Sequence, residues 1–305
     1  MSTTLDDKKL TPLLYLSKAG CAQQCPMRFY WQHHCHLTTK TRPEYFKFGS
    51  ACHKAVEIGL NYGFPVAEAC LCDRLDLAEQ LGLPLAKWNV DDITSSNEKD
   101  KHLMMQMVEA FEGAWKANGV KTLLSTEYSV QMPLEELGIK SKYFTHWVAK
   151  ADFVFEDMEG VWVGDLKTTA GYGPATAKYY HSSPQTKSYF HILQKRMPKL
   201  RGTKIFVVTK QKVRCEVEPI LITDTDHFQA QTFIEESVRQ MDRIEDDLRE
   251  GIFPTRFMTS CVNHFGSECP YIPLCINPVK DEAYAHDMIN NWYGFESPDK
   301  HLELD

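Results

Sequence analysis

The first third of the chain carries apolar residues at helical spacing. Residues Ser17 to Gln32 predict a short helix with Ser17 as its N-terminal cap. A second helix is predicted from about Glu44 to Leu60, where small and apolar residues recur on one face. Residues 66–118 add two further apolar stripes, joined by a polar connection from Asn89 to Asp100. This part of the chain is therefore predicted to be helical.

Strand-like runs follow at residues 123–130, 145–155 and 161–166. The last two are separated by Glu156-Asp157-Met158-Glu159-Gly160, which predicts a β-hairpin. The remaining elements are a helix from about Ser183 to Gln194, strands near 204–209 and 213–221, and a long helix from Asp224 to about Arg249. Helices and strands in this order predict an α/β protein.

Composition sets wider limits. The 305 residues are 43% hydrophobic and 25% charged, which is ordinary for a globular protein. No apolar run approaches the roughly 18 residues of a membrane span, and the first nine residues lack a signal-peptide core. We therefore expect a cytoplasmic protein without a membrane partner.

Charge is distributed unevenly along the chain. The formal net charge is −7, yet residues 140–214 contain fourteen Lys or Arg and five Asp or Glu, a local charge of +9. A basic zone of this kind favours a polyanionic ligand such as DNA. A solvated lysine face would give the same count.

The most informative segment is Val161-Trp-Val-Gly-Asp165-Leu-Lys167-Thr-Thr169. Asp165 and Lys167 lie two residues apart at a strand end, so their side chains share one face. Asp152 lies within the apolar strand before it, where a carboxylate needs a partner. Two carboxylates and a lysine can bind a divalent ion and stabilise a phosphoryl transition state. A structural ion pair is the alternative for Asp152.

Weaker signals accompany this segment. His53 and Glu57 are four residues apart on the second helix and face the same way, although a lone His there is also typical of a buried core position. Gln185 and Tyr189 are one helical turn apart and could face a common site.

Ten cysteines without a signal peptide indicate metal or redox chemistry rather than disulfides. Cys261, Cys269 and Cys275 lie in a loop rich in Gly and Pro, which we expect to need an external staple. The fourth ligand could be Cys25, Cys21 or His264. The other five, Cys35, Cys52, Cys70, Cys72 and Cys215, are predicted to be buried.

The chain resembles the PD-(D/E)XK nuclease superfamily, and within it the RecB-like branch. The resemblance is carried by Gly49-Ser-Ala-Cys-His53, Ala151-Asp152, Gly164-Asp-Leu-Lys-Thr-Thr169 and Gln185-x-x-x-Tyr189, and it extends from about residue 16 to 276. Cys25-Pro26 and the later trio Cys261, Cys269 and Cys275 are similar to the [4Fe–4S] cysteines of the AddB nuclease domain and of CRISPR-adaptation nucleases. The seven residues between Cys261 and Cys269 make a longer gap than is usual in that group.

The resemblance implies a role for each matching residue. His53, Asp152, Asp165 and the Leu166 carbonyl would bind Mg²⁺ or Mn²⁺, and the imidazole would favour Mn²⁺. Lys167 would stabilise developing negative charge or position the attacking water. Gln185 and Tyr189 would orient the substrate backbone. Glu127 is a weaker candidate for contact with the site or with Lys167.

The resemblance also implies a [4Fe–4S] cluster bound by Cys25, Cys261, Cys269 and Cys275. It would join the N-terminal and C-terminal segments like a clip. Zinc held by Cys261, His264, Cys269 and Cys275 is the lesser alternative. Phe29, Tyr30 and Trp31 near the cluster could stack on DNA bases or pack in the core.

The implied fold is a restriction-endonuclease-like core, with a central mixed sheet flanked by helices and a helical insertion. All segments would form one integrated nuclease domain. They are N-terminal helices (1–62), the insertion (63–120), the nuclease core (121–222), the long helix with the cysteine loop (223–280), and a peripheral acidic tail (281–305).

The expected function is a metal-dependent DNA exonuclease that acts on single strands or duplex ends in recombination, repair or replication. No phosphate-binding loop of the helicase type is present, so a helicase or a single-strand-binding protein is a possible partner. The alternatives are a catalytically silent DNA-binding or assembly subunit with the same fold, and a CRISPR-adaptation-type nuclease. A free-standing nuclease of this size is expected in a bacterial or phage-infected cell. The oligomeric state is not predicted.

Overall fold

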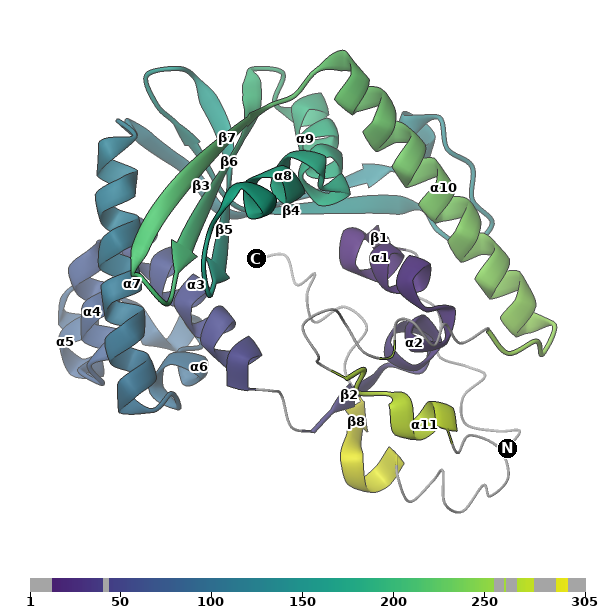
Figure 1. Cartoon of the computed structure of the whole chain (residues 1–305), viewed down its shortest axis with the longest axis horizontal. Helices are drawn as coiled ribbons and strands as arrows, with labels where there is room; N and C mark the ends of the chain where they lie inside the picture. Colours follow the sequence, from purple (N-terminus) through teal and green to yellow (C-terminus); the bar gives the residue numbers. More distant parts are fainter. Residues whose placement is uncertain (1–12, 41–43, 255–260, 262–267, 277–288, 296–305) are drawn as a thin grey trace. The chain divides into compact units, whose positions relative to one another are not determined.

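The computed structural model describes residues 13–40, 44–254, 261, 268–276 and 289–295. They form two compact units (Figure 1). The first unit comprises Met1–Thr41, Gln131–Ala149 and Gln231–Asp305, and the second comprises Arg42–Val130 and Lys150–Ala230. The segmental boundaries expected from the sequence remain predictions.

The second unit contains most of the strands and the helices that cover them. Its elements are α3 (Glu44–Tyr62), α4 (Phe64–Leu71), α5 (Leu75–Gln80), α6 (Asp91–Thr94), α7 (Glu98–Ala117), β3 (Thr122–Pro133), β4 (His146–Glu156), β5 (Val161–Thr169), α8 (Pro174–Ser182), α9 (Pro184–Arg196), β6 (Leu200–Thr209) and β7 (Arg214–Leu221). Strands β3 and β4 also continue into the first unit.

The sheet is mixed, as expected. Strands β4 and β5 pair as an antiparallel hairpin, β5 and β6 pair in parallel, and β6 and β7 pair antiparallel, while β3 pairs with β4. The crossover from β5 to β6 is made by α8 and α9, because parallel neighbours need a long connection. Helices lie on both sides of these strands in Figure 1.

Residue alternation along the strands separates the two faces. Phe153, Leu166 and Phe206 pack in a large core with α3, α4 and α7. The intervening positions Ile205 and Val207 pack instead with Tyr180 of α8. Asp165 and Lys167 alternate with Leu166, so they belong to the face covered by α8 and α9.

Close packing explains one glycine in the hairpin. A Cβ atom at Gly164 would lie 1.9 Å from a ring carbon of Phe153, the residue paired with it across β4 and β5. The core therefore needs a residue without a side chain immediately before Asp165. The hairpin turn ends at Gly160, which has φ of +140°, a conformation that favours glycine.

The first unit contains α1 (Leu16–Gln24), α2 (Pro26–Phe29), the two short strands β2 (Leu37–Thr39) and β8 (Tyr293–Phe295), α11 (Ile272–Ile276) and most of α10 (Asp224–Arg249). It also includes β1 (Leu13–Tyr15), which pairs in parallel with the first residues of β4. Strands β2 and β8 pair antiparallel.

Two predictions about this unit are wrong. The helix expected over Ser17–Gln32 begins at Leu16 after Tyr15, so Ser17 is not its cap, and it is interrupted at Cys25. Cys25 is extended because it precedes Pro26, which starts α2. Within the segment expected to form the acidic tail, Tyr293 of β8 is buried against Tyr271.

The first apolar stripe of residues 66–118 is divided between α4 and α5, and the remaining element predictions agree with the structure to within a few residues at the ends. Helix α6 inside the polar connection, helices α8 and α11, and strands β1, β2 and β8 were not predicted. None of the helices in the described part of the chain has the length and hydrophobicity that a membrane crossing requires.

Candidate active site

The candidate site lies in the second unit, where β4 and β5 stop pairing. Their ladder ends at Phe153 and Gly164. One residue further along each strand lie Asp152 and Asp165. The backbone N–H of Leu166 donates to Asp152 Oδ2 at 2.7 Å. This bond holds the Asp152 carboxylate beside the backbone of the strand that carries Asp165.

Lys167 neutralises Asp165 directly. Its Nζ lies 2.9 Å from Oδ1 and 2.8 Å from Oδ2 of that carboxylate. The Asp165 side chain is largely buried and Lys167 is about one-third exposed. Burial acts to lower the pKa of Lys167, but the carboxylates of Asp165 and Asp152 outweigh it and raise the pKa above its usual value. The lysine is therefore charged at neutral pH.

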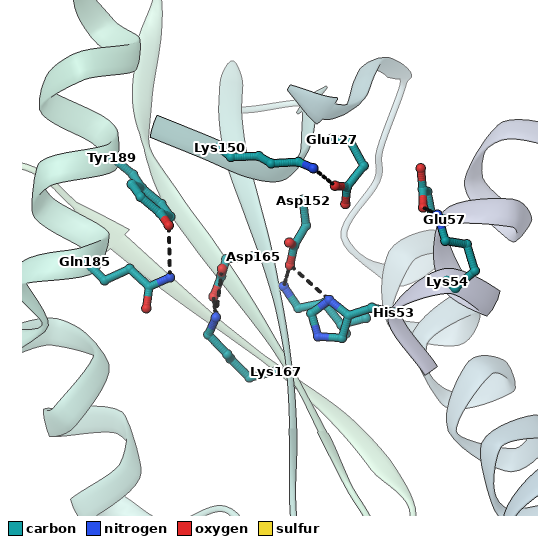
Figure 2. Close-up of polar contacts among 11 residues, drawn as sticks. His53, Lys54, Glu57, Glu127, Lys150, Asp152, Asp165, Lys167, Gln185 and Tyr189 are labelled. Atoms are coloured by element: carbon teal, nitrogen blue, oxygen red, sulfur yellow. Dashed lines mark hydrogen bonds and ion pairs between the residues drawn. The ribbon is translucent and has the colours of Figure 1, made fainter. Parts of the chain in front are cut away.

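The surroundings of Asp152 raise the pKa of its carboxyl group. Burial raises its pKa and the neighbouring Asp165 carboxylate raises it further, while His53 and Lys167 act in the opposite direction. His53 reaches it from α3, with Nδ1 3.6 Å from Asp152 Oδ2. Figure 2 shows His53 and Asp152 pointing toward each other, with Lys167 beside Asp165. The sheet and α3 thus place His53, Asp165 and Lys167 within electrostatic range of Asp152.

The donor atoms suit a hard divalent cation. Burial and the neighbouring Asp165 carboxylate raise the proton affinity of Asp152, so a positive charge beside Asp152 would be favourable. Carboxylate oxygens and an imidazole are ligands for Mg²⁺ or Mn²⁺. Within the described residues, however, no three His, Cys, Asp or Glu side chains are placed to hold one metal ion. Asp165 instead has both oxygens engaged by Lys167.

Gln185 and Tyr189 of α9 approach the same carboxylate from the opposite helix. Gln185 Nε2 donates to the Tyr189 hydroxyl at 3.4 Å. Burial raises the pKa of Tyr189, and Asp165 raises it further. Both side chains line a cavity of about 190 Å³ together with Asp165 and Lys167.

Helix α8 supplies residues that the sequence did not indicate. Tyr179 and Tyr180 of α8 line the same cavity. Ser183, between α8 and α9, and Thr186 of α9 line it as well. Burial raises the pKa of Tyr180; Lys167 opposes this rise and Asp165 adds to it, so the hydroxyl lies within electrostatic range of the site. A Pro- and Gly-containing segment with few aliphatic residues gave no periodic signal for this helix.

Glu127 lies in a neighbouring charged group rather than on Lys167. Its carboxylate is 2.6 Å from Lys150 Nζ on β4. Glu57 of α3, which pairs with Lys54 at 2.7 Å, lies close enough that Glu127 contributes to a raised pKa of Glu57, although burial is the main cause. Figure 2 shows this group next to Asp152 and His53.

The cysteines of the candidate cluster belong to the first unit. Burial raises the pKa of Cys21 to about 12; Arg28 opposes the rise, and Cys25 and Cys269 add to it, so these thiols are neighbours. The backbone N–H of Cys269 donates to the carbonyl of Cys261 at 2.7 Å. Cys275 is in α11. The zinc alternative included His264, which lies outside the described residues.

The aromatic residues near the candidate cluster, and the cysteines outside it, differ in how deeply they are buried. Phe29 and Tyr30 are buried, so they pack in the protein interior, and Trp31 packs against the same cluster as Tyr30. Cys35, Cys52 and Cys70 are buried as predicted, whereas Cys72 is exposed and Cys215 is half-buried.

The comparison with family models decides the classification. The model of the PD-(D/E)XK nuclease superfamily matches residues 16–276. The chain belongs to the PD-(D/E)XK nuclease superfamily. Members of this superfamily are generally nucleases that use a divalent metal, and the mixed sheet with its acidic hairpin agrees with that fold.

The solved structures that match this chain are distant. A "Putative exonuclease" from Eubacterium rectale has 14% sequence identity and a TM-score of 0.46, with 83% of this chain and 87% of that chain covered. SSO0001 has 10% identity and a TM-score of 0.31, with 77% and 79% covered. The search of curated proteins found no match.

Proposed function

We propose that the protein is a metal-dependent DNA exonuclease that hydrolyses phosphodiester bonds. The observation that carries the proposal is the joint placement of Asp152, Asp165 and Lys167 where β4 and β5 diverge, with His53 against Asp152. Membership of the nuclease superfamily supports the reaction class. We propose that the enzyme requires DNA ends and acts on single strands or on duplex ends. We also propose that it acts in the cytoplasm, in recombination, repair or replication.

Asp152, Asp165, His53 and the Leu166 carbonyl would hold Mg²⁺ or Mn²⁺. When bound, such an ion supplies an activated water and stabilises charge on the phosphate oxygens. Asp152 is kept in place by the Leu166 N–H, so the carboxylate need not be ordered when the ion arrives.

The residues of the chain have separate tasks in this proposal. Lys167 stays protonated and stabilises the negative charge that develops on the phosphate. Both oxygens of Asp165 lie within hydrogen-bond distance of Lys167 Nζ. To reach a phosphate, the lysine must therefore break its contact with at least one of these oxygens. Gln185 and Tyr189 would orient the DNA backbone from α9, because both residues line the cavity beside Asp165 and Gln185 donates to the Tyr189 hydroxyl.

The test is digestion of linear and circular single-stranded DNA with Mn²⁺ by wild type and by Asp165→Asn, which keeps the size of the side chain. Loss of linear DNA alone, abolished by the substitution, is the expected result. Cutting of circles would change the assignment to an endonuclease. No metal-dependent cleavage of either substrate would favour a silent DNA-binding subunit or an enzyme that a helicase or another partner activates.

We also propose that Cys25, Cys261, Cys269 and Cys275 bind a [4Fe–4S] cluster, the type expected of the RecB-like branch. Thiolates are the usual ligands of such clusters, and Cys25 and Cys269 are neighbours in the first unit. Arg28 lies near the thiols of Cys21 and Cys269, where a positive charge favours the thiolate form. Cys21 is the alternative to Cys25.

The cluster is tested by purifying the protein without oxygen and measuring iron, sulfide and zinc. Iron with a visible absorption band, lost in Cys25→Ala and retained in Cys72→Ala, is expected. Cys72 is a suitable control because it is exposed and lies in the second unit. Colourless protein with stoichiometric zinc would instead support the zinc site.

A further inference from the structure

The cavity beside the candidate site has an unused hydrogen-bonding group in its wall. Thr203 of β6 lines it, and its side chain is almost fully buried, with 3% of the residue exposed. In the described part of the chain, Thr203 Oγ1 has no hydrogen-bond partner. A buried hydroxyl without a hydrogen-bond partner is unfavourable. Its presence in a cavity wall therefore indicates a ligand that forms a hydrogen bond with it.

The position of Thr203 defines the direction of the cavity. Thr203 pairs with Val163 across β5 and β6, and Asp165 pairs with Ile205, so the hydroxyl lies two residues along the sheet from Asp165. Two residues of a strand span about 7 Å. The cavity therefore extends from the candidate metal ligands along the sheet surface, over roughly the length of one nucleotide.

The size of the cavity restricts what can enter. Its volume is about 190 Å³. A cavity of about 150 Å³ can hold one benzene ring. One unpaired base fits this space, whereas a base pair does not.

An aromatic ring is available at the edge of the cavity. Tyr179 lines it and is 66% exposed, so most of its ring is open to solvent. Its neighbour Tyr180 packs edge-on against it, with ring centroids 5.6 Å apart, and is itself buried on the sheet. Exposed aromatic rings beside a strand-binding site are used to stack unpaired bases.

We propose that this cavity receives one unpaired base of the DNA strand, adjacent to the phosphate that Asp165 and Lys167 engage. The base stacks on Tyr179, and Thr203 donates to or accepts from a polar edge of the base or sugar. The inference rests on the proposed nuclease function and deepens it, because it makes a single-stranded segment the substrate. A Thr hydroxyl is both donor and acceptor, so no strong base preference follows.

The test uses single-stranded oligonucleotides that carry one abasic residue at successive positions. Wild type should pause where the missing base would occupy the cavity, with cleavage there slower by roughly tenfold, the effect of losing one stacked base. In Tyr179→Ala, cleavage of normal DNA should fall by a similar factor and the pause should disappear. Tyr179→Phe retains the ring and should keep the pause at the abasic position.

Binding separates this inference from the proposed reaction. Fluorescence anisotropy in EDTA, with the same oligonucleotides, needs no hydrolysis. Weaker binding of the abasic strand by wild type, a difference lost in Tyr179→Ala and reduced in Thr203→Val, supports the cavity even if no cleavage is found. Equal cleavage and equal binding of normal and abasic strands by wild type would overturn the inference and leave the nuclease assignment intact.

Discussion

Replacement of Lys204 on β6 by methionine removes the ammonium group that pairs with Asp157 in the turn of the β4–β5 hairpin. The two side chains are almost fully buried and Lys204 Nζ lies 2.6 Å from Asp157 Oδ2. The same ammonium lies 4.6 Å from the centre of the Trp162 ring. Methionine keeps the unbranched shape that packs on Trp162, so the change removes the charge with little loss of volume.

The size of the effect follows from what remains around Asp157. Loss of one partner of a buried pair typically costs about 3–5 kcal/mol, because the other charge is left without compensation. Asp157 keeps three donors, the N–H groups of Glu159 and Gly160 and Nε1 of Trp162. These bonds continue to stabilise the carboxylate, so we expect the lower end, about 3 kcal/mol of unfolding free energy.

The assay is urea unfolding as a function of pH. In wild type, burial acts to raise the pKa of Asp157, but Lys204 and the hydrogen bonds outweigh it and lower the pKa below its usual value. The stabilisation is therefore complete above the unfolded pKa of about 4 and is lost below it. In Lys204→Met the buried Asp157 carboxylate lacks its cation and has a higher pKa than in wild type. As the pH falls, Asp157 is therefore protonated in the variant before it is protonated in wild type, and the variant no longer contains an unpaired buried charge. The difference in unfolding free energy between the two proteins should therefore shrink as the pH falls toward about 4, the unfolded-state pKa.

Lys212→Met is the matched control, since Lys212 is exposed in the turn between β6 and β7. It should change stability by less than about 0.5 kcal/mol. A loss below about 1 kcal/mol in Lys204→Met at neutral pH, or a loss that does not change with pH, would refute the assignment of the stabilisation to a buried charge pair.

Three further outcomes are expected. Lys167→Met should lower kcat for DNA hydrolysis with Mn²⁺ by about 10²–10³-fold, the usual effect of losing one transition-state stabiliser, and steady-state kinetics with unchanged kcat would exclude that role. Burial opposes ionisation of Asp226, but Lys187 and Thr223 lower its pKa to about 2. Asp226→Asn should therefore lower the unfolding free energy by about 2 kcal/mol at neutral pH, and in denaturation curves this loss should disappear between about pH 4 and pH 2 as wild-type Asp226 becomes protonated. Gly164→Ala should lower the melting temperature through a clash with Phe153 that costs about 1–3 kcal/mol, and a melting temperature equal to that of wild type would show that the hairpin core can yield.

The candidate site could be predicted from the sequence because its main residues occupy regular elements. The β4–β5 hairpin was predicted from two apolar runs and a short polar turn, and the positions of Asp165 and Lys167 within it then required a shared face. Helix α3 was predicted from its apolar stripe, which also oriented His53. Periodicity therefore sufficed for the long elements that carry these residues.

Features that depend on contacts between distant residues could not be predicted. The cavity wall combines Tyr179 and Tyr180 from α8 with Thr203 from β6, and nothing local marks Thr203 among the strand residues around it. Glu127 pairs with Lys150 rather than Lys167, a choice set by the approach of β3 to β4. The break at Cys25 was locally encoded by Pro26, and the helical periodicity on both sides concealed it.

The hydrogen bond from Leu166 to Asp152 has a consequence for evolution. Its donor is a main-chain N–H, which all amino acids except proline possess. Codon changes at position 166 can therefore alter the core packing of the leucine, which is 1% exposed, without removing the group that orients the carboxylate. A lineage of such proteins can drift at this residue, within the limits set by its hydrophobic neighbours, and still inherit the same placement of Asp152.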